Sequence, residues 1–85
     1  MTGKQTEAIK RTTYQNAIAR FKDIAIAHGL EAIVRSSEGV LRIEYRKDGV
    51  YMGGASYVGC AEHPEWLTER DMKSAELQVS RLSAK

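Results

Sequence analysis

The chain contains one cysteine, Cys60, and one proline, Pro64, among its 85 residues. A single cysteine excludes an intramolecular disulfide and a zinc site built from four thiolates, so a reducing cytoplasm is the compartment that we expect. No apolar run approaches the length of a membrane-spanning helix, and the polar residues 1–7 lack the hydrophobic centre of a signal peptide. We therefore expect a cytoplasmic protein with no membrane partner.

The chain also lacks a strong charge of either sign. Its 13 basic and 11 acidic residues are interspersed and leave a formal net charge of +2. Nucleic-acid binders usually carry a basic stripe or patch, so the charge of this chain alone does not indicate DNA or RNA as a ligand. The hydrophobic fraction of 42% and the charged fraction of 28% are ordinary for a globular protein, and the length suffices for one domain with a modest core.

The clearest pattern that is present is a β-hairpin over residues 40–58. From Leu41 to Arg46, apolar residues alternate with charged ones, as in a strand with one buried face. Asp48-Gly49 can supply the positive φ angles of a two-residue turn, which places Tyr45 opposite Met52 on the inner face. The outer face of this hairpin would then carry Arg42, Glu44, Arg46, Tyr51 and Tyr57.

Gly53-Gly54 interrupts the second strand of the hairpin. Glycines inside a strand usually mark a bulge or a close approach of another backbone. We expect a helix to pack closely over Gly54. A phosphate-cradling loop would need a Gly-Lys-Ser/Thr ending, which does not follow this pair.

An amphipathic helix precedes the hairpin. Apolar residues recur at helical spacing from Tyr14 to Ala25, and the charged residues lie outside their sector. Two capping boxes compete for the start of this helix, at Thr2 and at Thr12. We favour Thr12, because the apolar periodicity begins beside it. Gly29 is typical of the residue that ends a helix.

Two further segments complete a single domain over residues 13–85, with residues 1–12 as a polar arm or an extension of the first helix. Residues 31–36 have the composition of a strand, and a loop of two or four residues would join them to the hairpin. Ile33 would lie on the outer face of this strand. The last helix is predicted to begin near Pro64 or at Thr68. Its core stripe is Met72, Ala75, Val79 and Leu82.

The order α-β-β-β-α predicts an α+β fold, in which a three-stranded antiparallel sheet carries both helices on one face. The opposite face of the sheet would be free for a partner. Arginine and tyrosine are the residues that protein–protein hot spots favour, and glutamates beside them would repel phosphates. We therefore expect the outer face to bind a protein. The expected contact residues are Arg42, Arg46, Tyr51 and Tyr57.

A second candidate surface follows the last helix. Four residues recur at helical spacing on a face other than the core stripe, with apolar members and basic flanks, as at many interfaces. They are Trp66, Arg70, Lys73 and Leu77. The alternative interpretation is a solvated helix face with one stray leucine. A sheet edge, or Ile33 together with Leu77, could instead be covered by a second copy of the chain in a homodimer.

Cys60 and His63 invite two chemical interpretations. As metal ligands they supply two donors, with His28 as a third, but zinc takes three or four and no second cysteine pair exists. As a thiolate–imidazole pair they would need a pocket, an orienting group and oxyanion donors, none of which the sequence shows. We expect a structural cysteine and a protein that is not an enzyme, with no cofactor, no metal and no catalytic residue.

The last helix, Met72-Lys-Ser-Ala-Glu-Leu-Gln-Val-Ser-Arg-Leu-Ser-Ala, is similar to the lysine- and alanine-rich last helix of the double-stranded RNA-binding domain. Together with the order of elements from Tyr14 to Ala84, it makes the chain resemble that family. The resemblance implies a protein that grips RNA phosphates at the start of this helix, through Lys73 with Arg70 beside it. In that family a longer first hairpin loop also reaches the minor groove.

Two functional hypotheses follow. The first is a non-catalytic adaptor or inhibitor that docks on a protein partner, such as a component of nucleic-acid-handling machinery. In size and texture the chain resembles the compact inhibitors that phages and mobile elements encode. The second is a double-stranded RNA-binding protein that contacts phosphates through the last helix. The glutamates beside the outer-face arginines favour the protein partner.

Overall fold

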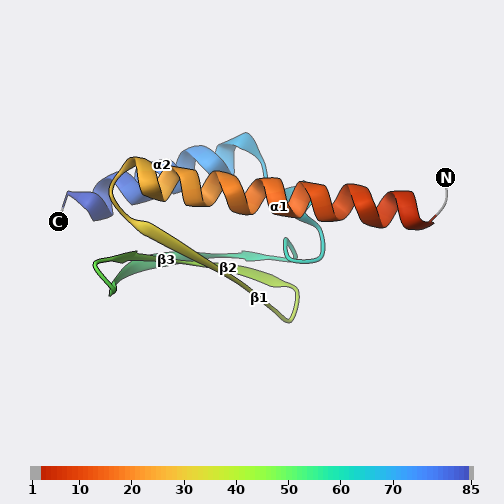
Figure 1. The fold of residues 1–85 in the computed structure, drawn as a ribbon, viewed down its shortest axis with the longest axis horizontal. Helices are drawn as coiled ribbons and strands as arrows, with labels where there is room; N and C mark the ends of the chain where they lie inside the picture. The colour runs from red at the N-terminus through yellow and green to blue at the C-terminus, as the bar shows by residue number, and fades with distance from the viewer. Residues whose placement is uncertain (1–2, 85) are drawn as a thin grey trace.

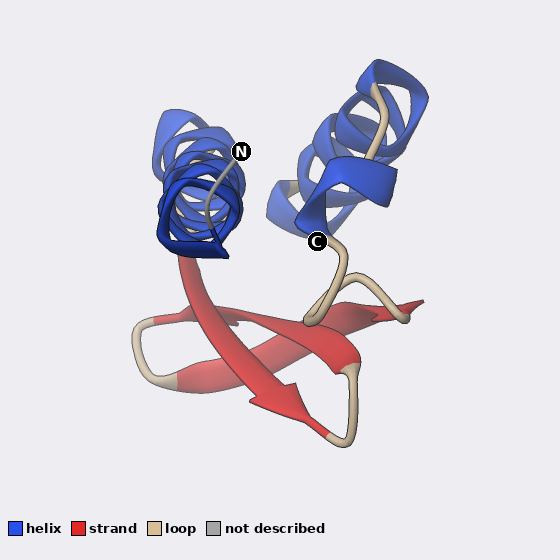
Figure 2. Ribbon diagram, turned by 90° about the vertical axis from the view of Figure 1, so that its right-hand side faces the viewer, coloured by secondary structure: helices blue, strands red, loops and turns tan. Residues whose placement is uncertain are grey.

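The computed structural model describes residues 3–84, with side chains from Thr13 to Ala84. Its elements are α1 (Gly3–Ala27), β1 (Glu31–Ser37), β2 (Val40–Lys47), β3 (Val50–Val58), the short 3-10 helix η1 (Pro64–Trp66) and α2 (Glu69–Ser83). The strands form one antiparallel sheet in the order β1-β2-β3, which confirms the predicted α+β fold. Both helices lie on the same side of this sheet (Figures 1 and 2). Neither of the described helices is long and apolar enough to cross a membrane.

Helix α1 begins earlier than the sequence pattern indicates. The helix is continuous from Gly3 to Ala27 and passes through Thr12, so the prediction that it starts at Thr12 is wrong. The other predicted start, at Thr2, lies outside the described residues. Residues 3–12 contain no proline and are rich in good helix formers, and each added residue gains one more hydrogen bond. Propagation of the helix therefore outweighs the capping preference of a threonine.

The other end of α1 forms as predicted at Gly29, whose φ angle is +75°. The Gly29 N–H donates to the Ile26 oxygen at 3.0 Å, and the Leu30 N–H donates to the Ala25 oxygen at 2.9 Å. These two bonds are the pair that defines a Schellman motif, which satisfies carbonyls that the last helical turn leaves open. The Leu30 side chain is buried beyond the motif, so the chain passes from α1 directly into β1.

The hairpin of β2 and β3 starts in the predicted register and then leaves it. Asp48 and Gly49 have φ angles of 51° and 80°, as the two-residue turn requires, and Arg46 lies opposite Tyr51. A bulge then inserts Met52, so that Tyr45 lies opposite Gly53 rather than opposite Met52. Because side chains alternate along a strand, this shift of one residue reverses the faces of every later residue of β3.

The reversal corrects the prediction for Tyr57. Its side chain belongs to the inner face, opposite Leu41, and is packed against the core instead of standing on the outer face. The rings of Tyr57 and Phe21 lie with their centroids 5.5 Å apart. Tyr57 therefore packs against the core from the inner face of the sheet and is not part of the exposed outer face.

The same shift exchanges the roles of the two glycines. Gly53, not Gly54, lies under helix α2, where an added Cβ would be 3.1 Å from Leu82 Cδ1. The expectation of close helix packing is therefore right in kind and wrong by one residue. Gly54 faces outward, opposite Glu44.

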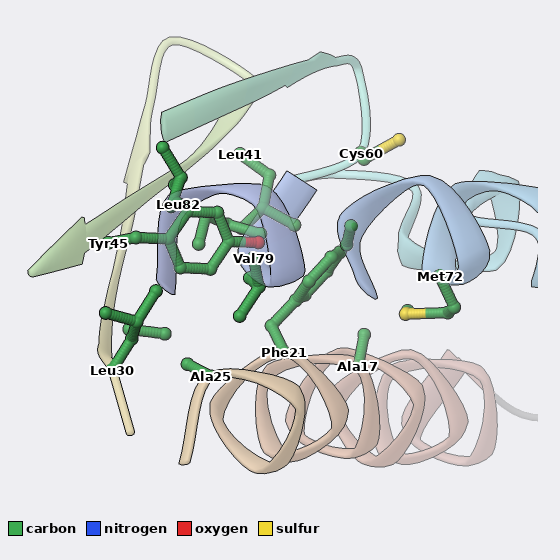
Figure 3. Packing of buried hydrophobic residues seen from close by; sticks show 13 residues of the cluster. Ala17, Phe21, Ala25, Leu30, Leu41, Tyr45, Cys60, Met72, Val79 and Leu82 are labelled. Carbon is green, nitrogen blue, oxygen red and sulfur yellow. The ribbon is translucent and has the colours of Figure 1, made fainter. Parts of the chain in front are cut away.

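One hydrophobic core fills the space between the sheet and the two helices (Figure 3). The predicted stripe of α2 and the inner face of β2 are fully included in it. The Tyr45 hydroxyl is a polar atom inside this core, and it has no hydrogen-bond partner among residues 13–84. The buried residues that form this core are Ala17, Phe21, Ala25, Leu30, Ala32, Leu41, Ile43, Tyr45, Cys60, Met72, Ala75, Val79 and Leu82.

Candidate functional site

The candidate site is the outer face of the sheet, which is the face turned away from both helices (Figure 2). The strand registers and the alternation of side chains decide which residues it carries. They are Glu31, Ile33, Arg35 and Ser37 from β1, Val40, Arg42, Glu44 and Arg46 from β2, and Tyr51, Gly54, Ser56 and Val58 from β3. Three of the four predicted contact residues of this face, Arg42, Arg46 and Tyr51, lie on it.

A hollow of about 450 Å³ lies in the middle of the outer face. Gly54 helps to form it, because a Cβ at this position would be only 2.5 Å from the backbone oxygen of Ile43 and 3.5 Å from the Tyr51 hydroxyl. The glycine therefore leaves room for the Tyr51 side chain beside it. The residues that line the hollow are Ile33, Arg35, Arg42, Ile43, Glu44, Tyr51, Gly54, Ala55 and Ser56.

One end of the outer face is dominated by an internal ion pair. Arg46 Nε and one terminal guanidinium nitrogen each lie 2.5 Å from Glu44 Oε2. Glu31 lies across the strands from Arg46. Arg46 is therefore already neutralised by its own strand, and a second carboxylate stands nearby. This end of the face offers little free positive charge to an incoming ligand.

The other end of the outer face has the opposite character. Arg35 lies directly opposite Arg42, and Ser56 lies opposite Arg42 on the other side. Both arginines are exposed, and neither has an ion-pair partner among residues 13–84. Like charges directly opposite each other destabilise a sheet. The pair therefore carries a cost to the fold that no described carboxylate offsets.

Sequence reasoning missed Arg35 and Ser56. The sequence pattern allows a loop of two or four residues between the first two strands, and only a two-residue turn places Arg35 opposite Arg42. That turn consists of Glu38 and Gly39, with φ angles of 52° and 76°. A dipeptide that ends in glycine between two strands is the signal that could have selected it. The alternating pattern of β3 does not reveal the bulge that brings Ser56 to the outer face.

The structure divides the second candidate surface. Trp66 lies in η1, ahead of the N-cap Thr68, and its ring stacks on His63 with centroids 4.3 Å apart. Arg70, Lys73 and Leu77 lie along α2 and are exposed. The helical spacing that joined these four residues does not run through Thr68, so the prediction of one continuous line from Trp66 is wrong.

Lys73, the expected phosphate contact, stands among acidic groups. It lines a shallow depression between the two helices together with Asp23, Glu69 and Glu76. Arg20 of α1 forms a bidentate ion pair with Glu69, with one of the two bonds at 2.9 Å. The hydrogen bond from this guanidinium lowers the pKa of Glu69, so the carboxylate is held in its charged form. The surroundings of Lys73 therefore oppose a dense negative ligand.

The structure gives the side chains of Cys60 and His63 different surroundings. Burial raises the pKa of the Cys60 thiol, which disfavours the reactive thiolate. The His63 ring stacks on Trp66, and its Nδ1 lies 3.2 Å from Glu65 Oε1. His28, the third suggested ligand, lies elsewhere, in a depression with Lys73 and Leu77. In the part of the chain that the structure describes, no three His, Cys, Asp or Glu side chains are placed to hold a metal ion.

Fold and site together define a small α+β domain with an uncovered sheet face that is hollow at its centre and unevenly charged. Comparisons with models of known protein families, with curated proteins and with solved structures give no match.

Proposed function

We propose that this protein is a non-catalytic binding protein, an adaptor or inhibitor, that docks on a protein partner through the outer face of its sheet. The observation that carries the proposal is the hollow in that face, where the half-buried Ile33 and the exposed Tyr51 lie beside unpaired arginines. Tyr51 is 61% exposed, which is a large aromatic surface to leave in water. Tyrosine and arginine around a depression are the typical anchors of protein interfaces.

The groups that line the hollow support binding better than catalysis. Glu44 is the one carboxylate among residues 13–84 that lines it, and this side chain is ion-paired to Arg46. Histidine and cysteine do not occur among the described residues that line it. General acid–base catalysis most often uses a histidine or a carboxylate within hydrogen-bonding reach of the substrate, whereas docking needs only complementary shape and charge.

Binding of duplex RNA through α2 is a second candidate. The order of elements and the exposed Arg70 and Lys73 favour it. Two features weigh against it. Three carboxylates line the same depression as Lys73, and the turn between β1 and β2 contains only Glu38 and Gly39, where the RNA-binding family uses a longer loop.

Affinity capture from the lysate of the native host, with and without nuclease, tests the proposed function. The bait is compared with Tyr51→Ala, which removes the aromatic anchor from the outer face, and with Leu77→Ala, which removes a 54% exposed side chain from α2. We expect a protein partner that survives nuclease, that binds Tyr51→Ala roughly tenfold more weakly or worse, and that binds Leu77→Ala normally. Circular dichroism shows that each variant is folded.

Two results would overturn the proposal. One is a partner whose binding is unchanged in both Tyr51→Ala and Ile33→Glu, because the outer face would then not be the docking surface. The other is capture of nucleic acid together with proteins that are all lost after nuclease treatment. Loss of that nucleic acid in Lys73→Gln would transfer support to the RNA-binding candidate.

A further inference from the structure

Arg35 and Arg42, the two outer-face arginines without an ion-pair partner among residues 13–84, lie directly opposite each other. Side chains directly opposite each other on neighbouring strands have Cβ atoms about 4.5–5.5 Å apart, so the guanidiniums of Arg35 and Arg42 can reach a common point above the sheet. A carboxylate or phosphate at that point accepts charge-assisted hydrogen bonds from both groups. Ser56, opposite Arg42 on β3, adds a hydroxyl at the same level of the face.

No carboxylate among residues 13–84 forms an ion pair with Arg35 or Arg42. Glu44 is two positions along β2 from Arg42, and it is ion-paired to Arg46. Glu38 stands in the adjacent turn and is not ion-paired to either arginine. An external anion would relieve the repulsion between Arg35 and Arg42, so binding it stabilises the folded state as well as the complex.

The surrounding carboxylates also limit what kind of anion fits. A nucleic-acid strand brings one phosphate per nucleotide and needs a row of cations. Here the positive end holds two unpaired cations and is bounded by Glu38 on one side and by Glu44 and Glu31 on the other. A continuous polyanion would meet those carboxylates. A short acidic group with apolar neighbours would instead match the arginines together with Ile33 and Tyr51.

We propose that Arg35 and Arg42 are the recognition point for carboxylate in a short acidic segment of the partner protein, flanked by apolar residues that enter the hollow. This inference rests on the proposed function and adds the chemistry of the partner. It assigns Arg35 a role that only the observed pairing of β1 with β2 makes visible.

The test is an NMR titration of the ¹⁵N-labelled protein with a synthetic peptide that has two adjacent glutamates flanked by leucine and phenylalanine. The matched peptide carries glutamine at both positions. We expect saturable shifts centred on the amides of Arg35, Arg42 and Ser56, and roughly tenfold weaker binding for Arg35→Gln or Arg42→Gln. Arg81→Gln is the matched control, because it removes the same charge from an exposed position of α2, on the other side of the sheet, and it should bind normally.

Four results would overturn the inference. They are the absence of saturable shifts, equal binding of the glutamine peptide, an equal loss in Arg81→Gln, and tighter binding of duplex RNA at the same amides. The last result would assign the pair to a phosphate ligand. Capture from lysate separates this failure from failure of the proposed function. Suppose that a partner does not bind Tyr51→Ala but still binds Arg35→Gln and Arg42→Gln. This result would contradict the carboxylate site and still support docking through the outer face.

Discussion

Gln78 of α2 donates a 2.8 Å hydrogen bond from its side-chain Nε2 to the backbone oxygen of Gly54 in β3. β3 is an edge strand, so this bond ties the second helix to the border of the sheet at the residue that helps to form the outer hollow. It also occupies a backbone acceptor of a strand whose open groups would otherwise attract another strand. The inner packing and the outer face are therefore connected at Gly54.

Gln78→Ala should lower the free energy of unfolding by about 1 kcal/mol, since it removes a partly buried hydrogen bond and leaves the Gly54 carbonyl without this partner. Urea denaturation followed by circular dichroism measures the change. Gln15→Ala, at an exposed position of α1, is the matched control and should have a smaller effect. Equal losses in the two variants would show that the contact contributes nothing to stability.

Gly54→Ala should destabilise the protein more than Gly53→Ala. The Cβ at residue 54 would be 2.5 Å from the Ile43 backbone oxygen, which cannot move without distorting β2, whereas the Cβ at residue 53 meets only the flexible end of Leu82. Overpacking of this kind costs about 1–3 kcal/mol, and we expect Gly53→Ala at the lower end of that range. Thermal melts give the order of the two variants. Leu82→Val combined with Gly53→Ala should recover part of the loss, and the reverse order of the single variants would contradict the placement of the bulge.

Tyr45→Phe should leave the free energy of unfolding unchanged or raise it. The hydroxyl that it removes is fully buried without a partner among residues 13–84, and an unsatisfied buried polar group costs about 1–3 kcal/mol. The phenylalanine ring would occupy the same space in the core. Chemical denaturation at neutral pH measures the difference, and a marked loss of stability would mean that the hydroxyl has a partner after all.

The same variant should change the alkaline limit of stability. Burial raises the pKa of Tyr45 from 10.0 to about 12. The folded protein holds this proton more tightly than the unfolded chain does, so the contribution is fully present below about pH 10 and is lost as the pH rises toward 12. Tyr45→Phe should lose less stability than the wild type between these values. Parallel alkaline titration curves for the two proteins would rule this out.

Arg35→Thr should raise the free energy of unfolding by about 0.2–1 kcal/mol, because it removes the repulsion with Arg42 and supplies a residue that favours strands. Arg46→Thr, which breaks the ion pair with Glu44, should not be stabilising in the same way. Denaturation of both variants in low salt makes the comparison. A loss of stability in Arg35→Thr would mean that the arginine already has a stabilising partner in the free protein.

Local patterns predicted the elements whose geometry depends on near neighbours. Helix α2 begins after Thr68, one of its two predicted starts, and a capping box forms there, with the Asp71 N–H 3.2 Å from Thr68 Oγ1 and the Thr68 N–H 2.8 Å from Asp71 Oδ2. Gly29 ends α1, and Asp48-Gly49 makes the hairpin turn. Each of these features is decided by residues within a few positions of one another, so a single sequence contains what is needed to find it.

The sequence by itself determined the order of elements, the core stripe of α2 and the inner face of β2, because periodicity alone specifies which side of an element is apolar. Tertiary structure decided the faces of β3, since packing of α2 over Gly53 goes with a bulge at Met52 that turns Tyr57 inward. It also decided that Arg35 faces Arg42 without a carboxylate between them. A period-two pattern shows neither a one-residue insertion nor the partner across a strand, and the candidate site depends on both.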